Sequence, residues 1–300
     1  MKNQKHSLLH TKCQVEKRSI YLVLSFSDSN CTNPNEDLLQ AAKVGWWGGA
    51  VGYILQHCSN NTDINTEDST YHYFTPLIWA SENGDSEVVE LLLQHPQIEV
   101  NKGDNDGWTA LHLASLNGDS EVVELLLQHP QIDVNKRDDG NRHPALYKAS
   151  MEGHSEVVEL LLQHPHIDVN HGHPDGTTPL IASIYSGKIE IAEILLRQPQ
   201  IDVNKARTID GISPLYAASM MGISEVIKLL LGNPKIDVNK GLTSGGDNPL
   251  QRACEDGNTE IVKLLVGHRN ILVNKERTGS GATSLWIASH VGSSGNVYFV

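Results

Sequence analysis

The histidines are the residues of this chain whose type and spacing could do chemistry, because a neutral imidazole is the commonest protein ligand of metal ions. His164, His166, His171 and His173 lie in one short segment. A cluster of this density in a single loop is a candidate zinc site. The alternative is that these four side chains have only structural roles.

A second set of histidines recurs at equivalent positions along the chain: His95, His129, His164 and His268. Equivalent atoms of stacked helices lie about 8–10 Å apart, whereas a Zn–N bond is about 2 Å long. No two of these side chains therefore share an ion readily. We expect each to lie at the C-terminus of a helix, where a protonated ring would interact favourably with the helix dipole.

Motifs for catalysis are missing from the sequence. Gly187-Lys188 lacks both the preceding glycine and the following Ser or Thr of a phosphate-binding loop. Nothing resembles the G-x-S-x-G turn that presents a nucleophilic serine. The sequence therefore predicts that this chain is not an enzyme, with no catalytic residue, no cofactor and no metal ligand.

Charge excludes two classes of partner. The chain has 300 residues and a formal net charge of −13, from 36 acidic and 23 basic side chains. Nucleic-acid binding depends on Lys and Arg to neutralise phosphates, and anionic lipid surfaces attract basic segments. We therefore expect neither a nucleic acid nor a membrane as partner.

The cysteines favour a reducing compartment. Cys13, Cys31, Cys58 and Cys254 show no paired spacing, and Cys254 is predicted to be a buried, inert thiol. The apolar run at 20–24 is too short to span a bilayer, and no clear cleavage site follows it. A cytoplasmic protein is the prediction, with the nucleus as the alternative.

The elements that position all these residues follow from a repeat. A leucine recurs every 34 or 35 residues, and a glycine follows each leucine seven residues later. The leucines are Leu77, Leu111, Leu146, Leu180, Leu215, Leu250 and Leu285. The glycines are Gly84, Gly118, Gly153, Gly187, Gly222, Gly257 and Gly292. This self-similarity predicts a solenoid, in which one short unit is stacked repeatedly on its neighbours.

Each unit reads as two short helices. Thr109 is the expected N-cap of a first helix at about 110–116, and Gly118 ends that helix by adopting a left-handed conformation. Ser120 starts a second helix, and His129-Pro130 ends it because proline disfavours helical geometry in the preceding residue. Other copies begin with an N-cap hydroxyl followed by proline: Thr75-Pro76, Thr178-Pro179 and Ser213-Pro214.

These segments resemble the ankyrin-repeat signature T-P-L-H-x-A, as at 75–80, 109–114 and 213–218. The Asp-Val-Asn endings at 133–135, 168–170, 202–204 and 237–239 are similar to those of the same family. The resemblance covers residues 36–296. It implies an all-α ankyrin-repeat solenoid with a helix-turn-helix and a β-hairpin loop in each repeat.

The chain departs from the family pattern in three places. Its unit of 34 or 35 residues is longer than the family's 33. Only His112 occupies the histidine position of the signature. The copy that starts at His143-Pro144 has no hydroxyl before its leucine, which leaves the capping of that helix open.

The asparagines that end the hairpins are Asn101, Asn135, Asn170, Asn204 and Asn239. In animal members of the family such asparagines can be hydroxylated by an oxygenase. The alternative is that each side chain closes its own turn with hydrogen bonds.

The sequence predicts the following domain organisation. Residues 1–33 form a flexible N-terminal segment, and residues 34–300 form the ankyrin-repeat domain. A degenerate unit spans about 36–65, and repeats start near 75, 109, 144, 178, 213 and 248, with a truncated one near 283. The truncated copy is either a stunted second helix that caps the stack or part of a longer chain.

The resemblance implies that partners bind a concave face lined by the first helices and the hairpin tips. The fifth position after each repeat leucine belongs to that face and reads Lys43, Glu82, Leu116, Met151, Tyr185, Met220, Glu255 and His290. The hairpins add Trp108, Ile209 and Ile212 beside its apolar centre, with Tyr71, His72 and Phe74 at the N-terminal side. An apolar centre with a polar rim is typical of a protein interface. The alternative is that these side chains pack against their own hairpins.

We therefore expect a monomeric, non-catalytic protein-interaction module or scaffold whose partner is a protein with some basic character. The predicted binding residues are Trp108, Leu116, Met151, Tyr185, Ile209, Ile212 and Met220. The rival interpretation is a targeting or regulatory arm of a larger enzyme, ubiquitin-ligase adaptor or channel whose effector domain lies elsewhere.

Overall fold

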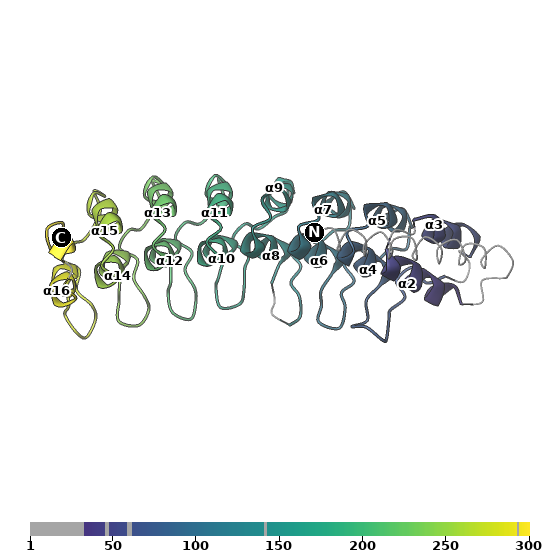
Figure 1. The fold of residues 1–300 in the computed structure, drawn as a ribbon, viewed down its shortest axis with the longest axis horizontal. Coiled ribbons are helices and arrows are strands. Elements are labelled where there is room, and N and C mark those ends of the chain that lie inside the picture. Colours follow the sequence, from purple (N-terminus) through teal and green to yellow (C-terminus); the bar gives the residue numbers. More distant parts are fainter. Residues whose placement is uncertain (1–32, 46–47, 59–61, 141–142, 293) are drawn as a thin grey trace, which may run out of the picture. The chain divides into compact units, whose positions relative to one another are not determined.

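The computed structural model describes residues 33–45, 48–58, 62–140, 143–292 and 294–300. The predicted flexible segment 1–33 therefore lies outside the described residues except for Asn33. The described chain is built from pairs of short α-helices joined by tight turns (Figure 1). Its helices are α2 (Pro34–Val44), α3 (Gly48–His57), α4 (Pro76–Glu82), α5 (Ser86–Leu93), α6 (Ala110–Asn117), α7 (Ser120–Leu127), α8 (Ala145–Glu152), α9 (Ser155–Gln163), α10 (Pro179–Tyr185), α11 (Ile189–Leu196), α12 (Pro214–Met221), α13 (Ser224–Leu231), α14 (Pro249–Glu255), α15 (Thr259–Val266), α16 (Ser284–His290) and α17 (Ser294–Val297).

The chain divides into two compact units. The first contains the residues up to Leu113 and Glu124–Ile132, and the second contains Ala114–Val123 and Asp133–Val300. In the first unit α2 packs on α4, and α3 packs on α5. In the second unit α8, α10, α12, α14 and α16 form one layer, and α9, α11, α13, α15 and α17 form the other (Figure 1). The predicted all-α repeat fold is confirmed.

Hydroxyl caps start several first helices as predicted. Thr75 accepts a hydrogen bond from the Ile78 N–H at 3.2 Å. Thr178 and Ser213 cap α10 and α12 in the same way, each with proline at the start of the helix. Each cap satisfies one backbone donor that has no partner inside its helix.

The helix at the departure from the signature starts without such a cap. Pro144 is the N-cap of α8, and its side chain makes no capping hydrogen bond. Its extended backbone still directs the chain into α8 at the same register as in the other repeats. The burial of Leu146, like that of its equivalents, shows this register.

Gly118 shows why the turn inside each repeat requires glycine. Its φ is +82°, in the left-handed region that side chains rarely adopt. A Cβ at this position would lie 2.5 Å from Nδ1 of His154. The prediction that this glycine ends the first helix is confirmed.

The repeat leucines show how the second unit is held together. Leu146, Leu180, Leu215 and Leu250 are all at most 1 % exposed. Leu285 in the last first helix, α16, is 42 % exposed. The leucine occupies the second position of its helix in all five cases, and the exposed one belongs to the helix that only the single turn α17 follows in the described chain.

The ends of the chain depart from the full repeat. The predicted degenerate unit is the helix pair α2–α3, in which Leu38 and Ala41 are buried. At the other end α17 is a single turn of four residues that packs on α16 and α15. Trp46 and Trp47 lie outside the described residues.

The hairpins of the resemblance are loops without a β-ladder. Within the described ranges, β-pairing outside helices is limited to two isolated bridges, Asp68 with Phe74 and Arg137 with Pro144. Successive loops of the second unit are linked by single backbone hydrogen bonds, such as Thr208 N–H to Asp175 O at 2.7 Å. The loops are therefore ordered by their neighbours rather than by their own pairing.

The loop asparagines link each repeat to the next, which corrects the expectation that they close their own turns. Asn204 donates from Nδ2 to Lys235 O at 2.6 Å and accepts at Oδ1 from the Asp237 N–H at 2.8 Å. Lys240 adds a hydrogen bond from Nζ to Asn204 O. Asn65, Asn135, Asn170 and Asn239 make the same pair of side-chain hydrogen bonds to the following repeat. The predicted turn closure is made instead by aspartates such as Asp202, which accepts from the Asn204 N–H.

The loop before α8 contains a buried carboxylate next to a buried lysine. Asp138 is 1 % exposed, and the Lys148 Nζ lies 3.6 Å from its Oδ2. The His143 ring stacks on Tyr147 with 4.3 Å between ring centroids. Burial and the nearby Lys148 charge lower the pKa of His143 from 6.5 to about 4.

Replacing Asn204 with alanine removes two hydrogen bonds between repeats and leaves one N–H and one carbonyl without these partners. We expect Asn204→Ala to lower the free energy of unfolding by about 1–2 kcal/mol, because a hydrogen bond inside a protein contributes about 0.5–1.5 kcal/mol and two are lost. Urea denaturation followed by circular dichroism measures this change. Gln200→Ala, at an exposed side chain in the preceding turn, should change stability by less than about 0.5 kcal/mol. Equal losses in both variants would contradict the bridging role.

The depressed pKa of His143 makes stability depend on pH in a defined window. Between pH 6.5 and about 4 the unfolded chain binds a proton at His143 that the folded chain does not bind, so stability falls as the pH falls through this range. The loss reaches about 2–3 kcal/mol by pH 4. We expect His143→Thr, which places there the residue type of Thr177 in the next repeat, to lose less stability on acidification.

Denaturation at a series of pH values measures the slope for both proteins. His290→Thr, at an exposed histidine of α16, should retain the wild-type slope. The pKa of Asp175 is lowered to about 2, so its own contribution is lost only below the usual aspartate range. A His143→Thr slope equal to that of the wild type would contradict the assignment.

Candidate partner-binding surface

Four apolar side chains occupy equivalent places near the ends of successive first helices in the second unit. Leu116, Met151, Tyr185 and Met220, here called the first-helix stripe, are all partly exposed. The repeat leucine of each helix lies five residues earlier and is buried. Five residues correspond to a rotation of about 140° around a helix, so the stripe is turned away from the core. The predicted positions are thus accessible.

Polar side chains continue the stripe toward the C-terminus. Glu255 in α14 and His290 in α16 occupy the same helix position and are both exposed. Within the second unit the apolar part of the row therefore ends where these residues begin. This is the order of an apolar centre followed by a polar rim.

Tyr185 is fixed in place by the loop that precedes α12. Its hydroxyl shares a hydrogen bond with Arg207, and burial raises the pKa of the tyrosine. Arg207 also pairs with Asp175 at 3.3 Å and with Asp210 at 3.5 Å. The tyrosine therefore does pack partly on its own hairpin, as the alternative interpretation expects, while its ring stays partly exposed.

Asp175 links the loop before α10 to the loop before α12 through its contacts with Arg207 and Thr208. Burial acts to raise its pKa, but hydrogen bonds from Thr177 and His173 outweigh burial and lower the pKa to about 2. Gly176 beside it has φ +89°, and a Cβ there would lie 2.5 Å from the Thr208 N. This close approach of two loop backbones holds the second loop against the first.

The two loop isoleucines differ in exposure. Ile209, at the tip of the loop between α11 and α12, is 64 % exposed, whereas Ile212 is partly exposed near the start of α12. Ile209 does not pack on its own hairpin to any large extent. It is the most exposed of the predicted binding residues.

Trp108 lies in the first unit. It is partly exposed, and its ring centroid lies 6.2 Å from that of His112. His112 is buried, and the hydroxyl of Thr109 lies 2.8 Å from its Nδ1. The Thr109 hydroxyl therefore bonds to the signature histidine.

The first unit contains an aromatic cluster with more members than the sequence predicted. Tyr71, Phe74 and Trp79 pack together with ring centroids 4.8–5.2 Å apart. His72 and Tyr73 have φ of +48° and +60°, a backbone strain that non-glycine residues rarely carry. Tyr73 is 47 % exposed and was not predicted as a surface residue. Its only sequence signal is the run of rings at 71–74.

The histidines do not converge on a common point. The His164 and His166 rings lie 5.8 Å apart, while His171 lies near Asp168 and His173 pairs with Asp175 at 2.7 Å. In the described part of the chain no three His, Cys, Asp or Glu side chains are arranged to hold a metal ion.

The recurring histidines close the turns that follow the second helices. In His95, His129, His164 and His268, Nδ1 accepts a hydrogen bond from the backbone N–H two residues later. A ring protonated at Nδ1 could not accept this bond. Burial lowers the pKa of His164, which favours the same neutral form.

Reactive groups are buried or paired in the described ranges. Cys254 is fully buried, and burial raises its thiol pKa to about 12, which confirms the predicted inert thiol. Cys58 forms a disulfide, which differs from the unpaired cysteines expected for a reducing compartment; Cys13 and Cys31 lie outside the described residues. Among the helices described, none has the length and apolar composition needed to cross a bilayer.

Comparison with known proteins identifies the repeat. A family model described as ankyrin repeats (3 copies) matches residues 38–138, 133–207, 199–277 and 215–299. The crystal structure of the ankyrin repeat domain of Bcl-3, a member of the IkappaB protein family, superimposes with a TM-score of 0.67 over 75 % of this chain and 97 % of that chain. The sequence identity of that pair is 24 %, so the likeness concerns the fold.

One curated relative matches a short part of the chain. The probable palmitoyltransferase AKR2 of Saccharomyces uvarum is 44 % identical over 62 residues, which are 21 % of this chain and 8 % of that protein. The chain thus spans a small fraction of this relative's length.

The family model covers far more than half of the described repeats, and the helix pairs, caps and turn glycines agree with it. This chain belongs to the ankyrin-repeat family, whose repeats are protein-interaction modules.

Proposed function

We propose that this protein binds a protein partner through the first-helix stripe and the adjoining loop tip at Ile209. The observation that carries this proposal is the row of four partly exposed apolar side chains on successive first helices. Partly exposed apolar side chains at equivalent positions of successive helices are more typical of an interaction site than apolar side chains scattered singly. Methionine and tyrosine are also enriched in interface centres.

The surroundings of the stripe support a preformed surface. Arg207, Asp175 and Asp210 hold the loop beside Tyr185, and backbone hydrogen bonds hold successive loops together. A surface ordered before binding loses less conformational entropy when a partner binds. Met151 and Met220, on either side of the fixed tyrosine, supply adaptable side chains.

The partner is proposed to be a protein segment with some basic character, since the chain carries a net charge of −13. The same charge argues against nucleic acids and anionic membranes. We propose a non-catalytic scaffold role for a monomer in the cytoplasm or nucleus. The thiol count of the protein isolated from cells tests the location, because one disulfide at Cys58 would leave two free thiols and a reduced chain would have four.

Acidic substitutions in the stripe test the binding surface. We expect Met151→Glu combined with Met220→Glu to weaken the partner complex by about 10- to 100-fold, because a charge placed in an apolar interface centre loses its hydration. Affinity purification with mass spectrometry identifies the partner, and calorimetry with that purified partner measures the affinity. Met221→Glu is the matched control, since Met221 neighbours Met220, is 44 % exposed and points in another direction.

All three proteins should have the same helical circular dichroism and thermal midpoint, because the changed side chains are partly exposed. Capture of the same partners by the double variant with unchanged affinity would refute the stripe as the binding surface. Equal weakening by Met221→Glu would show that the effect is not specific to the stripe.

A second candidate is the partner-binding arm of a larger protein. The match to 62 residues of a probable palmitoyltransferase favours it, because the matching segment is 8 % of that protein and so belongs to a much longer chain. Sequencing of the transcript past the codon for Val300 tests this idea. An open reading frame that encodes a further domain supports it, and a stop codon directly after Val300 contradicts it.

A further inference from the structure

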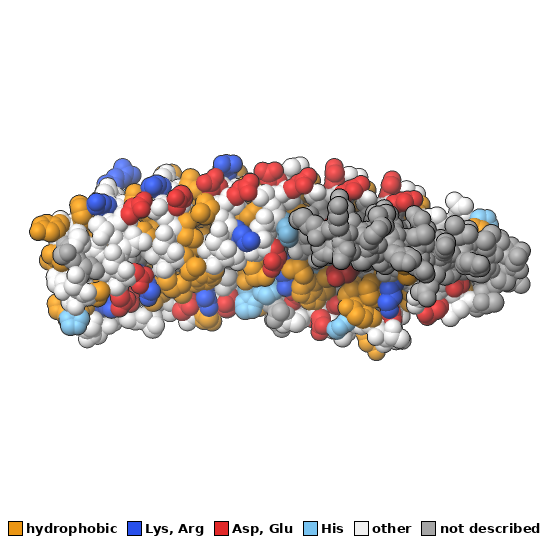
Figure 2. Space-filling view, in the orientation of Figure 1, with side chains coloured by type: hydrophobic (Ala, Val, Ile, Leu, Met, Phe, Trp, Pro, Cys, Tyr) orange, Lys and Arg blue, Asp and Glu red, His pale blue; other side chains and the backbone are white. Residues whose placement is uncertain are grey.

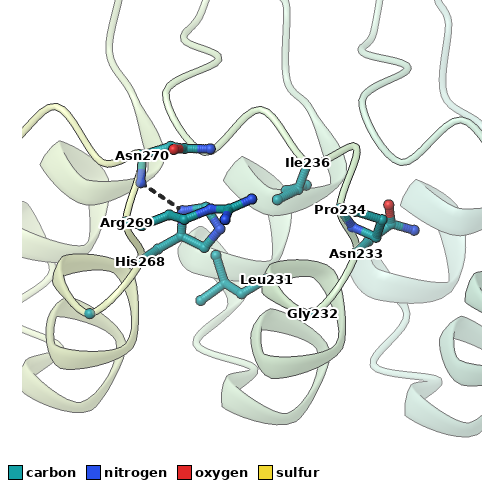
Figure 3. A pocket seen from close by; sticks show the side chains of 9 residues that line it. Leu231, Gly232, Asn233, Pro234, Ile236, His268, Arg269 and Asn270 are labelled. Carbon is teal, nitrogen blue, oxygen red and sulfur yellow. Dashed lines mark hydrogen bonds between the residues drawn. The ribbon is translucent and has the colours of Figure 1, made fainter.

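A pocket lies on the second-helix side of the protein, away from the first-helix stripe. It is formed where α13 and α15 end and has a volume of about 430 Å³ (Figure 3). Its walls include Leu231, Gly232, Ile236, Gly267, His268 and Arg269. The Leu231 and Arg269 side chains point into the space between the two turns (Figure 3).

Two glycines open this pocket, and the backbone does not require either of them. Gly232 and Gly267 follow α13 and α15 with φ of −72° and −67°, in the right-handed helical region. Gln94 and Arg197 have almost the same conformation at the equivalent position of other repeats. The effect of the two glycines is therefore to remove side chains from the rim of the pocket.

Arg269 is a third departure from the repeat at the same place. The equivalent residue is proline in five preceding repeats: Pro96, Pro130, Pro165, Pro199 and Pro234. The arginine is exposed and lines the pocket. Three departures from the framework thus meet in one cavity.

A depression two repeats earlier corresponds to this pocket only in part. Between α9 and α11 it is lined by Gln163 and Arg197 among others and measures about 320 Å³. Both positions carry long side chains there, where the later pair has glycine. The later pocket is larger.

Charge on the second-helix side changes at the same point. Residues 155–168 and 189–202 contain six carboxylates and one arginine, whereas the equivalent residues 224–237 and 259–272 contain three carboxylates and four cations. Figure 2 shows acidic side chains over α9 and α11 and Lys and Arg side chains over α13 and α15. A surface with one more cation than carboxylates, on a chain of net charge −13, is a local feature that favours an acidic ligand.

Some of the cations around the pocket have a partner within the protein, and others have no carboxylate partner among the described residues. Lys228 lies 3.6 Å from Glu260, and Lys263 lies over the Phe299 ring. Arg269 and Lys235 have no carboxylate partner in the described part of the chain. A guanidinium without a partner can bind a carboxylate through two hydrogen bonds.

We propose that the pocket between α13 and α15 binds an acidic peptide segment of a partner protein, with a carboxylate on Arg269 and an adjacent aliphatic side chain on Leu231 and Ile236. This surface is separate from the first-helix stripe and lies in the same compact unit. The protein then has two binding surfaces of different chemistry.

A peptide-display selection tests this proposal without a known partner. A library of random peptides is selected on the full chain and counter-selected on Gly232→Gln combined with Arg269→Pro, which restores the residues of the other repeats. We expect enrichment of peptides in which Asp or Glu neighbours Leu, Ile or Val. Labelled with a fluorophore, such a peptide should bind Gly232→Gln and Arg269→Pro more than about tenfold more weakly than the wild type, because a charge-assisted hydrogen bond or the space for the side chain is lost.

Arg197→Ala, in the depression between α9 and α11, is the matched control and should leave the affinity unchanged. The Met151→Glu and Met220→Glu variant should also bind the selected peptide normally, so failure here is distinct from failure of the stripe. Arg269→Gln keeps the local backbone and replaces Arg269→Pro if the proline variant does not fold. In NMR spectra the peptide should shift the amide signals of Gly232 and Gly267.

Three results would overturn the proposal. The first is a selection that yields no peptide preferring the wild type over the restored variant. The second is enrichment of peptides without acidic residues. The third is an equal response of the two glycine signals to inorganic phosphate alone, which would assign the pocket to small anions.

Discussion

Every repeat of this protein has an apolar face that the repeat itself cannot cover. The same leucine is at most 1 % exposed in α8, α10, α12 and α14 and 42 % exposed in α16. The difference is the neighbour that follows, because helix pairs of this size leave much of their apolar surface in contact with water. The loop asparagines fix the orientation of one repeat on the next, since each asparagine side chain forms hydrogen bonds with two backbone groups of the next repeat. Stacking and loop conformation are therefore fixed by the same neighbour.

Local sequence signals predicted the helices well, because each depends on one or two adjacent residues. A hydroxyl before proline predicted the caps at Thr75, Thr178 and Ser213, and glycine predicted the left-handed turn at Gly118. The contacts of Asn204 were predicted wrongly, since its partners lie 31 and 33 residues later. A turn interpretation uses only near neighbours, so it cannot anticipate a hydrogen bond across a repeat interface.

From the sequence, the first-helix stripe could be predicted only as a set of residue positions, without the contacts that hold its side chains. Helical spacing placed Met151, Tyr185 and Met220 away from the buried leucines, and the structure agrees that they are accessible. The anchoring of Tyr185 by Arg207 and the strained backbone at Tyr73 had no sequence signal of comparable strength. The pKa of His143 was equally hidden, because it depends on burial and on Lys148 in the following helix. The Tyr185 and His143 effects arise where a loop side chain meets a neighbouring helix in three dimensions.

A regular framework makes it possible to separate residues needed for folding from residues that are not. Leu146 and its equivalents in α10, α12 and α14 have the same role, because each is buried in the core between neighbouring helix pairs. Gly232 and Gly267 solve no backbone problem, since Gln94 and Arg197 adopt the same conformation with side chains. Glycine at a helix end with right-handed geometry even weakens the helix slightly relative to residues with side chains. A small cost in stability at two neighbouring repeats, next to an arginine where other repeats have proline, is easier to explain by a ligand than by folding.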